Sequence, residues 1–148
     1  MSTSVADSLN TLLADTTVFY QKLRHYHWNV QGQDFFELHL KFEEVYNKWV
    51  VYIDEIAERV IALDTVPLHT LGSMLKHARL AEDEELPEAR EMVNRTIADL
   101  VSLRESIDGT IGEAEESGDR TTVNILDAIR DGLEADRWML VTWLKKRS

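Results

Sequence analysis

The chain has 148 residues, 44% of them hydrophobic and 29% charged, a composition typical of one soluble globular domain, residues 1–148, with a sizeable core. Its formal net charge of −11 repels nucleic-acid phosphates and attracts cations. The chain has no cysteine, which excludes disulfides and thiolate metal sites. No apolar run is long enough for a membrane span and no secretory signal is visible, so a cytoplasmic location is expected.

Apolar residues recur at intervals of three or four in four long segments, which predicts four helices. The first carries an apolar face from Val5 onward and should end near Gly32, a residue that readily adopts a left-handed helix end. The second follows Asp34, which together with Glu37 resembles a capping box, and runs to about Leu63.

The second half of the chain predicts one short and two long helices. Residues 70–78 suit a short extra helix, which an acidic loop at 82–85 follows. Pro87 suits the first turn of the third long helix, Gly118 ends it, and the fourth begins at about Thr121. Two short turns and one long connection indicate an all-α, four-helix bundle with a short extra helix between helices two and three.

Two acidic or mixed pairs stand at helical spacing on the second helix. His39 and Glu43 are four residues apart, and so are Asp54 and Glu58, and all four share one stripe of the helix. The fifteen residues from His39 to Asp54 cover roughly 22 Å of helix, so one chain cannot close both pairs around one metal ion. An antiparallel second copy, related by a two-fold axis near residues 47–49, would bring the pairs together twice per dimer.

His27 extends this candidate site. The turn between the first two helices centres near residue 33, with His27 six residues before it and His39 six after it. In an antiparallel hairpin the two histidines therefore lie at similar heights. The combined set of two imidazoles and three carboxylates suits iron, manganese or zinc better than magnesium or copper.

Simpler readings of these residues stay open at this stage. A histidine and a glutamate four apart can form a surface contact, and Asp54 and Glu58 can pair with Lys48 or Arg59. The motifs H-E-x-x-H, G-x-x-x-x-G-K-[ST] and G-x-S-x-G are absent. So is E-x-x-H, the helix motif of di-iron sites built within one bundle.

The stretch H-W-N-V-Q-G-Q-D-F-F-E-L-H-L-K-F-E-E, residues 27–44, followed by D-E-I-A-E-R-V, residues 54–60, resembles the signature of the Dps family. These mini-ferritins are also called DNA-binding proteins from starved cells. The helix order, the short extra helix and the late W-M-L-V-T-W-L extend the resemblance over most of the chain.

The resemblance implies a ferritin-like subunit of a hollow dodecamer, with a ferroxidase centre at each two-fold interface. By motif position His27, His39 and Glu43 come from one subunit, and Asp54 and Glu58 from its partner. The family often has aspartate where this chain has Glu43. The implied reaction oxidises Fe(II) with hydrogen peroxide or dioxygen and stores ferric mineral inside the shell, which protects against oxidative damage.

Two further features follow from the resemblance. Trp28 beside His27 either shapes the pocket or intercepts a stray oxidising equivalent. Family shells have acidic pores at the turn between the last two helices, through which iron enters. The candidate pore residues here are Glu115, Glu116, Asp119 and Asp127.

DNA binding marks a departure from part of the family. Members that bind DNA commonly use a lysine-rich N-terminal tail, whereas the first basic residue here is Lys22. Weak or absent DNA binding is therefore expected. A DNA-compacting structural protein and a family member recruited to another metal-dependent reaction remain as alternative functions.

Overall fold

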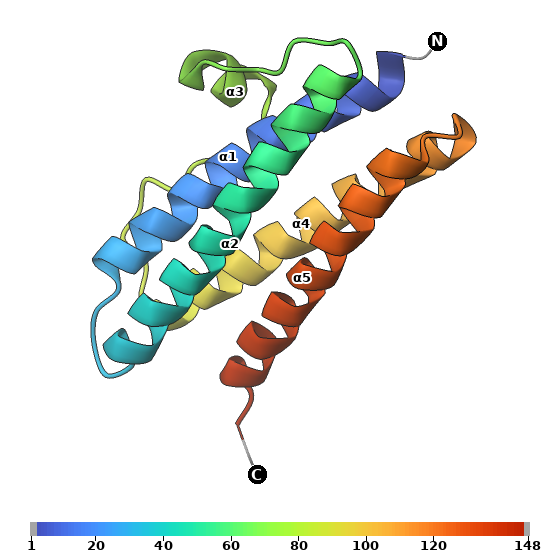
Figure 1. Ribbon diagram of the computed structural model, residues 1–148. Helices are drawn as coiled ribbons and strands as arrows, with labels where there is room; N and C mark the ends of the chain where they lie inside the picture. The colour runs from blue at the N-terminus through green and yellow to red at the C-terminus, as the bar shows by residue number, and fades with distance from the viewer. Residues whose placement is uncertain (1–2, 147–148) are drawn as a thin grey trace.

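The computed structural model describes residues 3–146. These residues form four long helices and a short one: α1 (Thr3–Asn29), α2 (Phe35–Ala62), α3 (Leu71–His77), α4 (Ala89–Glu116) and α5 (Arg120–Leu144). Figure 1 shows α1 and α2 as one antiparallel hairpin, α4 and α5 as a second, and α3 outside the bundle beside α1. The predicted all-α bundle with an extra helix in its long connection is confirmed.

The bundle is held by the apolar stripes that the sequence pattern predicted. Each long helix turns one face inward, and the largest fully buried side chains include Trp49, Tyr26, Phe19 and Phe42. Trp49 lies edge-on against Phe19, with ring centroids 5.1 Å apart. None of the helices between residues 3 and 146 has the length and apolar character that crossing a bilayer requires.

The helix ends agree with the predictions except between α1 and α2 and at the start of α4, which begins at Ala89, two residues after Pro87. Thr70 caps α3 by accepting a hydrogen bond from the Ser73 N–H, and Asp119 caps α5 by accepting one from the Thr122 N–H. The predicted capping box at Asp34 does not form, because neither of its side-chain oxygens accepts a cap hydrogen bond. Helix α1 ends at Asn29, three residues before the left-handed Gly32.

The long connection between α2 and α4 runs along α1 and is fastened to it by polar side chains (Figure 1). Asn10 accepts a hydrogen bond from the Leu68 N–H at 2.9 Å. Asp15, only 2% exposed, accepts hydrogen bonds from the Arg79 and Leu80 N–H groups at 2.6 and 3.0 Å. These bonds satisfy backbone donors that an irregular segment would otherwise leave unpaired.

Polar side chains join α2 and α5 at three places along the seam between them. Trp143 donates to Glu37 near one end, and Arg59 contacts Asp119 at 2.7 Å near the other. Between them the nearly buried Asp136 carboxylate contacts the ammonium groups of Lys41 and Lys48, at 3.5 and 3.1 Å. Charge-assisted bonds of this kind contribute roughly 1.5–3 kcal/mol each when partly buried.

Gly132 of α5 marks the closest approach in this seam, and its substitution tests the packing. A Cβ atom at this position would overlap the phenol oxygen of Tyr52 and lie 3.2 Å from its Cζ. We expect Gly132→Ala to lower the free energy of unfolding by about 1–3 kcal/mol, because Tyr52 must leave its place beside Trp49. Urea unfolding followed by circular dichroism measures the change.

The matched control is Gly109→Ala in α4, where a Cβ atom meets nothing within 4 Å. There the better helix propensity of alanine should raise stability by up to about 1 kcal/mol. Adding Tyr52→Phe to Gly132→Ala should recover part of the loss, since it removes the overlapping oxygen. Equal stability of Gly132→Ala and the unsubstituted chain would contradict this packing.

Candidate metal centre

Among the candidate site residues, His27 and His39 are in direct contact with each other. The two imidazoles stack with ring centroids 3.8 Å apart and an interplanar angle of 14°. The Nδ1 of His27 lies 2.7 Å from the His39 carbonyl oxygen, and the Nδ1 of His39 lies 2.7 Å from the His27 carbonyl oxygen. Because a carbonyl only accepts, each Nδ1 carries the proton.

This reciprocal pairing fixes the chemistry of both rings. With the proton on Nδ1, the neutral form of each ring has its lone pair on Nε2, and this is the form of imidazole that binds a metal ion. His27 is 8% exposed, and His39 is held between His27 and the Phe35 ring, whose centroid lies 4.8 Å away. The rings therefore have little freedom to turn, and a metal ion would meet ligands that are already oriented.

The local sequence explains why these rings meet. His27 lies in the last turn of α1, where carbonyl groups have no intrahelical partner, and the imidazole of His39 supplies a donor to one of them. The hairpin turn of residues 30–34 places the start of α2 beside the end of α1. The expectation that the two histidines lie at similar heights is confirmed.

The carboxylates lie on the face of α2 that points away from the core. Asp54 and Glu58 are exposed and Glu43 is half-buried, whereas Phe42, Val45 and four further residues of α2 are buried in the core. The alternative pairing of Asp54 and Glu58 with nearby cations is not observed, since Lys48 contacts Asp136 and Arg59 contacts Asp119.

One protomer does not bring the two halves of the candidate site together. Within residues 3–146, no group of three or more potential ligands lies close enough to hold one metal ion. His27 and His39 are adjacent, but the distance from His39 to Asp54 along α2 is roughly 22 Å. In one protomer the two histidines are therefore separated from Asp54 and Glu58 by most of the length of α2.

Tyr46 is a neighbour of the candidate site that the sequence analysis did not single out. Its ring lies edge-on against the imidazole of His27, with centroids 5.3 Å apart. Burial, and then the charge of nearby Glu43, raise the pKa of Tyr46, so its phenol is protonated at neutral pH. Its position one turn after Glu43 is the signal that could have found it.

Comparison with known proteins identifies the family. A family model described as a ferritin-like domain matches residues 6–148. General stress protein 20U of Bacillus subtilis is 40% identical over 97% of this chain and 99% of its own length. The DNA protection during starvation protein of Brevibacillus brevis is also 40% identical, over 95% of each chain.

Solved structures agree with the sequence matches. The crystal structure of a Dps protein from Bacillus brevis superposes with a TM-score of 0.95 at 40% identity, over 97% of both chains. The chain belongs to the Dps family of ferritin-like proteins. The Dps protein of Vibrio cholerae O1 superposes with a TM-score of 0.94 at 38% identity, over 97% of this chain and 91% of that one. It is described as a member of a broad superfamily of ferritin-like diiron-carboxylate proteins.

The candidate pore residues of this Dps chain differ in their surroundings. Glu115, Glu116 and Asp127 are exposed near the turn between α4 and α5. Asp119 is instead engaged, because it caps α5 and contacts the guanidinium of Arg59 at 2.7 Å. Those hydrogen bonds outweigh the effect of burial and lower the pKa of Asp119. Asp119 is thus the least available of the four to bind a cation.

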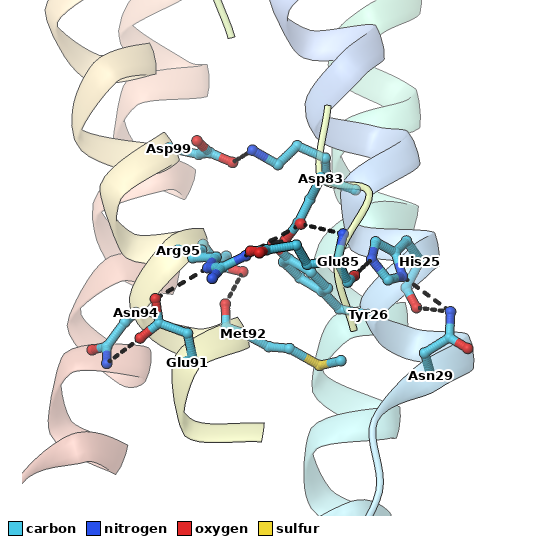
Figure 2. A network of polar contacts seen from close by, with 12 residues as sticks. His25, Tyr26, Asn29, Asp83, Glu85, Glu91, Met92, Asn94, Arg95 and Asp99 are labelled. Atoms are coloured by element: carbon cyan, nitrogen blue, oxygen red, sulfur yellow. Dashed lines mark hydrogen bonds and ion pairs between the residues drawn. The ribbon is translucent and has the colours of Figure 1, made fainter. Parts of the chain in front are cut away.

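A network of polar contacts joins the last turns of α1 in this Dps chain to the long connection and to α4 (Figure 2). Tyr26, fully buried between His25 and His27 in the sequence, donates a hydrogen bond to Asp83 of the long connection. Asp83 also contacts Arg95 of α4 at 3.1 Å, and His25 contacts the Glu85 carbonyl oxygen at 2.8 Å. The turn of α1 that carries His27 is therefore tied to α4 through the connection.

Asp83 gives this network a dependence on pH. Burial alone would raise the pKa of Asp83, but hydrogen bonds from Tyr26, the Glu85 N–H and Arg95 lower it overall. A lowered pKa in the folded state means that the ionised form stabilises the fold above the unfolded-state pKa of about 3.9. This stabilisation disappears as the pH falls through the lower, folded-state pKa.

We expect Asp83→Asn to lower the melting temperature at pH 7, because the amide still accepts from Tyr26 but loses its charge opposite Arg95. The loss should correspond to about 1–3 kcal/mol and should shrink as the pH falls below about 4. Differential scanning calorimetry at several pH values measures it. A loss that stays constant across this range would contradict the assigned role of the Asp83 charge.

Proposed function

We propose that this chain is a ferroxidase that oxidises Fe(II) with hydrogen peroxide or dioxygen and stores the ferric product inside a dodecameric shell. The observation that carries the proposal is the pair of imidazoles at His27 and His39, each locked with a free Nε2. Two neutral imidazoles together with carboxylates form a nitrogen and oxygen donor set that suits iron. The family membership supports iron storage and protection of DNA as the general role.

The proposed site is shared between two subunits. His27, His39 and Glu43 of one subunit face Asp54 and Glu58 of its partner, across a two-fold axis near residues 47–49 of α2. Asp54 and Glu58 are exposed, and the nearby Lys48 and Arg59 form ion pairs with residues of α5 instead. The two carboxylates are therefore free to face such a partner. Each dimer then contains two equivalent sites.

The residues have distinct roles in the proposed reaction. Fe(II) is the substrate, and its electrons pass to the peroxide or dioxygen. The imidazoles of His27 and His39 bind Fe(II), while the carboxylates of Glu43, Asp54 and Glu58 offset the higher charge of the ferric product. Consuming Fe(II) and peroxide together suppresses hydroxyl radical formation.

The proposal also includes an entry route for iron, formed by acidic side chains at the α4–α5 turn. Glu115, Glu116 and Asp127 would line a pore that attracts Fe(II) toward the interior, with Asp119 contributing less because Arg59 holds it. The glutamate at position 43, where the family often has aspartate, reaches one methylene further. The alternative function, another metal-dependent reaction, would use the same ligands to hold another metal ion.

Subunit complementation tests whether the site is shared. His39→Ala and Asp54→Ala should each lose most of their rapid Fe(II) oxidation. When the two variants are co-expressed, half of the dimers are mixed, and each mixed dimer rebuilds one intact site and one doubly damaged site. About one site in four should then be active, measured as the initial rate of iron oxidation.

The outcome distinguishes a shared site from one within a single chain. Co-expression of His39→Ala with Glu43→Ala is the matched control, because both substitutions affect the same half of the site and no mixed dimer can restore it. Equal rates for the two co-expressed pairs would rule out the shared site. A dimer of about 34 kDa rather than a particle of about 205 kDa on sizing would rule out the dodecamer, since each subunit is 17.1 kDa.

The DNA-compacting alternative has its own test. Twelve chains of net charge −11 carry about −132 in total, so the shell should repel DNA at neutral pH. We expect no retardation of linear DNA in a gel at low salt without magnesium. Clear retardation under those conditions would favour the DNA-compacting function instead.

A further inference from the structure

Two buried polar atoms of the core, one on α2 and one on α5, have no hydrogen-bond partner among residues 3–146. The first is the indole Nε1–H of Trp49, a side chain that is 0% exposed. The second is the Oδ2 atom of Asp136, which is 1% exposed. One is a donor and the other is an acceptor. Because an unpaired polar group in a protein interior costs free energy, each of them needs a partner.

Asp136 is engaged through one of its two oxygens. Its Oδ1 atom contacts the ammonium groups of Lys41 and Lys48, at 3.5 and 3.1 Å. Both lysines thus use the same oxygen, although a carboxylate accepts hydrogen bonds at both. The Oδ2 atom is therefore the part of this buried side chain that still requires a donor.

Tyr52 connects the surroundings of the two atoms. Its ring lies edge-on against that of Trp49, with centroids 5.1 Å apart. Its phenol oxygen lies against Gly132, which is one turn before Asp136 on α5. Burial, and then the charge of Asp136, raise the pKa of Tyr52, which agrees with this proximity. Trp49 and Asp136 therefore border the same stretch of the interface between α2 and α5, although no hydrogen bond joins them.

The chemistry of the pair selects its ligand. A cation would be repelled by the positive end of the Trp49 N–H dipole, and an anion would be repelled by the Asp136 carboxylate. A neutral molecule that accepts one hydrogen bond and donates another satisfies both atoms. We propose that one water molecule is bound here as part of the core, accepting from the Trp49 N–H and donating to Asp136 Oδ2. Two such partners are within the range found for buried structural waters in proteins.

The bound water joins the two hairpins of the bundle, because Trp49 belongs to α2 and Asp136 to α5 (Figure 1). It also completes the environment of the Asp136 carboxylate, which holds Lys48 at Oδ1 and accepts from the water at Oδ2. None of the five candidate ligands of the metal centre takes part. The inference is therefore independent of the proposed ferroxidase function.

A crystal structure of the assembled protein, at a resolution that shows ordered waters, tests the proposal directly. We expect one density peak in hydrogen-bond contact with both Trp49 Nε1 and Asp136 Oδ2 in every subunit. With two hydrogen bonds of ordinary length, the two protein atoms should lie roughly 4.5–5 Å apart. In crystals of Trp49→Phe the peak should be lost, because the carboxylate alone offers the water a single partner.

Ultraviolet resonance Raman spectroscopy tests the same contact in solution. One indole band shifts when the N–H donates a hydrogen bond, and subtracting the spectrum of Trp49→Phe isolates the band of Trp49. We expect this band at the position of a hydrogen-bonded N–H. In Asp136→Leu, which removes the acceptor, the band should move to the position of a free N–H.

Trp143 supplies the matched control, since its N–H donates directly to Glu37 at 3.2 Å. The band isolated with Trp143→Phe should mark a hydrogen-bonded N–H and should not move in Asp136→Leu. A direct bond between Trp49 and Asp136 in the crystal, or the lack of a peak between them, would overturn the proposal. So would a free N–H band for Trp49 in the unsubstituted protein. The crystal structure decides the question even where Asp136→Leu does not fold.

Discussion

The exchange of hydrogen bonds between His27 and His39 is the interaction on which both the hairpin and the candidate site depend. Each imidazole donates from Nδ1 to the backbone carbonyl of the other residue, at 2.7 Å in both cases. For the fold, this supplies a donor to a carbonyl at the end of α1 and joins it to the start of α2. For the chemistry, it selects one tautomer of each ring. This exchange thus holds a helix end and orients two candidate ligands.

Helix α2 serves three surfaces at once, and its charges are distributed accordingly. Its apolar stripe enters the core, its basic residues turn to α5, and its acidic residues remain outside. Had Lys48 or Arg59 paired with Asp54 or Glu58 instead, those carboxylates would be neutralised within the subunit. The buried Asp136 and the helix cap at Asp119 compete for the cations and keep them away. The polar seam therefore contributes to the candidate site as well as to stability.

Local patterns predicted the helices and the similar heights of His27 and His39, because the causes of both are local. Periodic apolar residues define a helix face, and the spacing from His39 to Asp54 follows from helical rise alone. The capping box at Asp34 failed because Glu37 instead accepts a hydrogen bond from Trp143, which lies far along the chain. The tie from Tyr26 to Asp83 was missed for the same reason, since 57 residues separate its partners.

Arg24 places a positive charge close to the candidate site for a metal cation. A cation one turn from His27 opposes the binding of another cation, so its place beside a proposed iron site calls for a compensating role. Its guanidinium donates to the neutral Gln21 and stacks on two aromatic rings, so it is not there to neutralise an acid. The guanidinium lies between Tyr20 and Trp28, one turn before it and one turn after it on α1, and these two ring contacts hold its charge on that face of the helix.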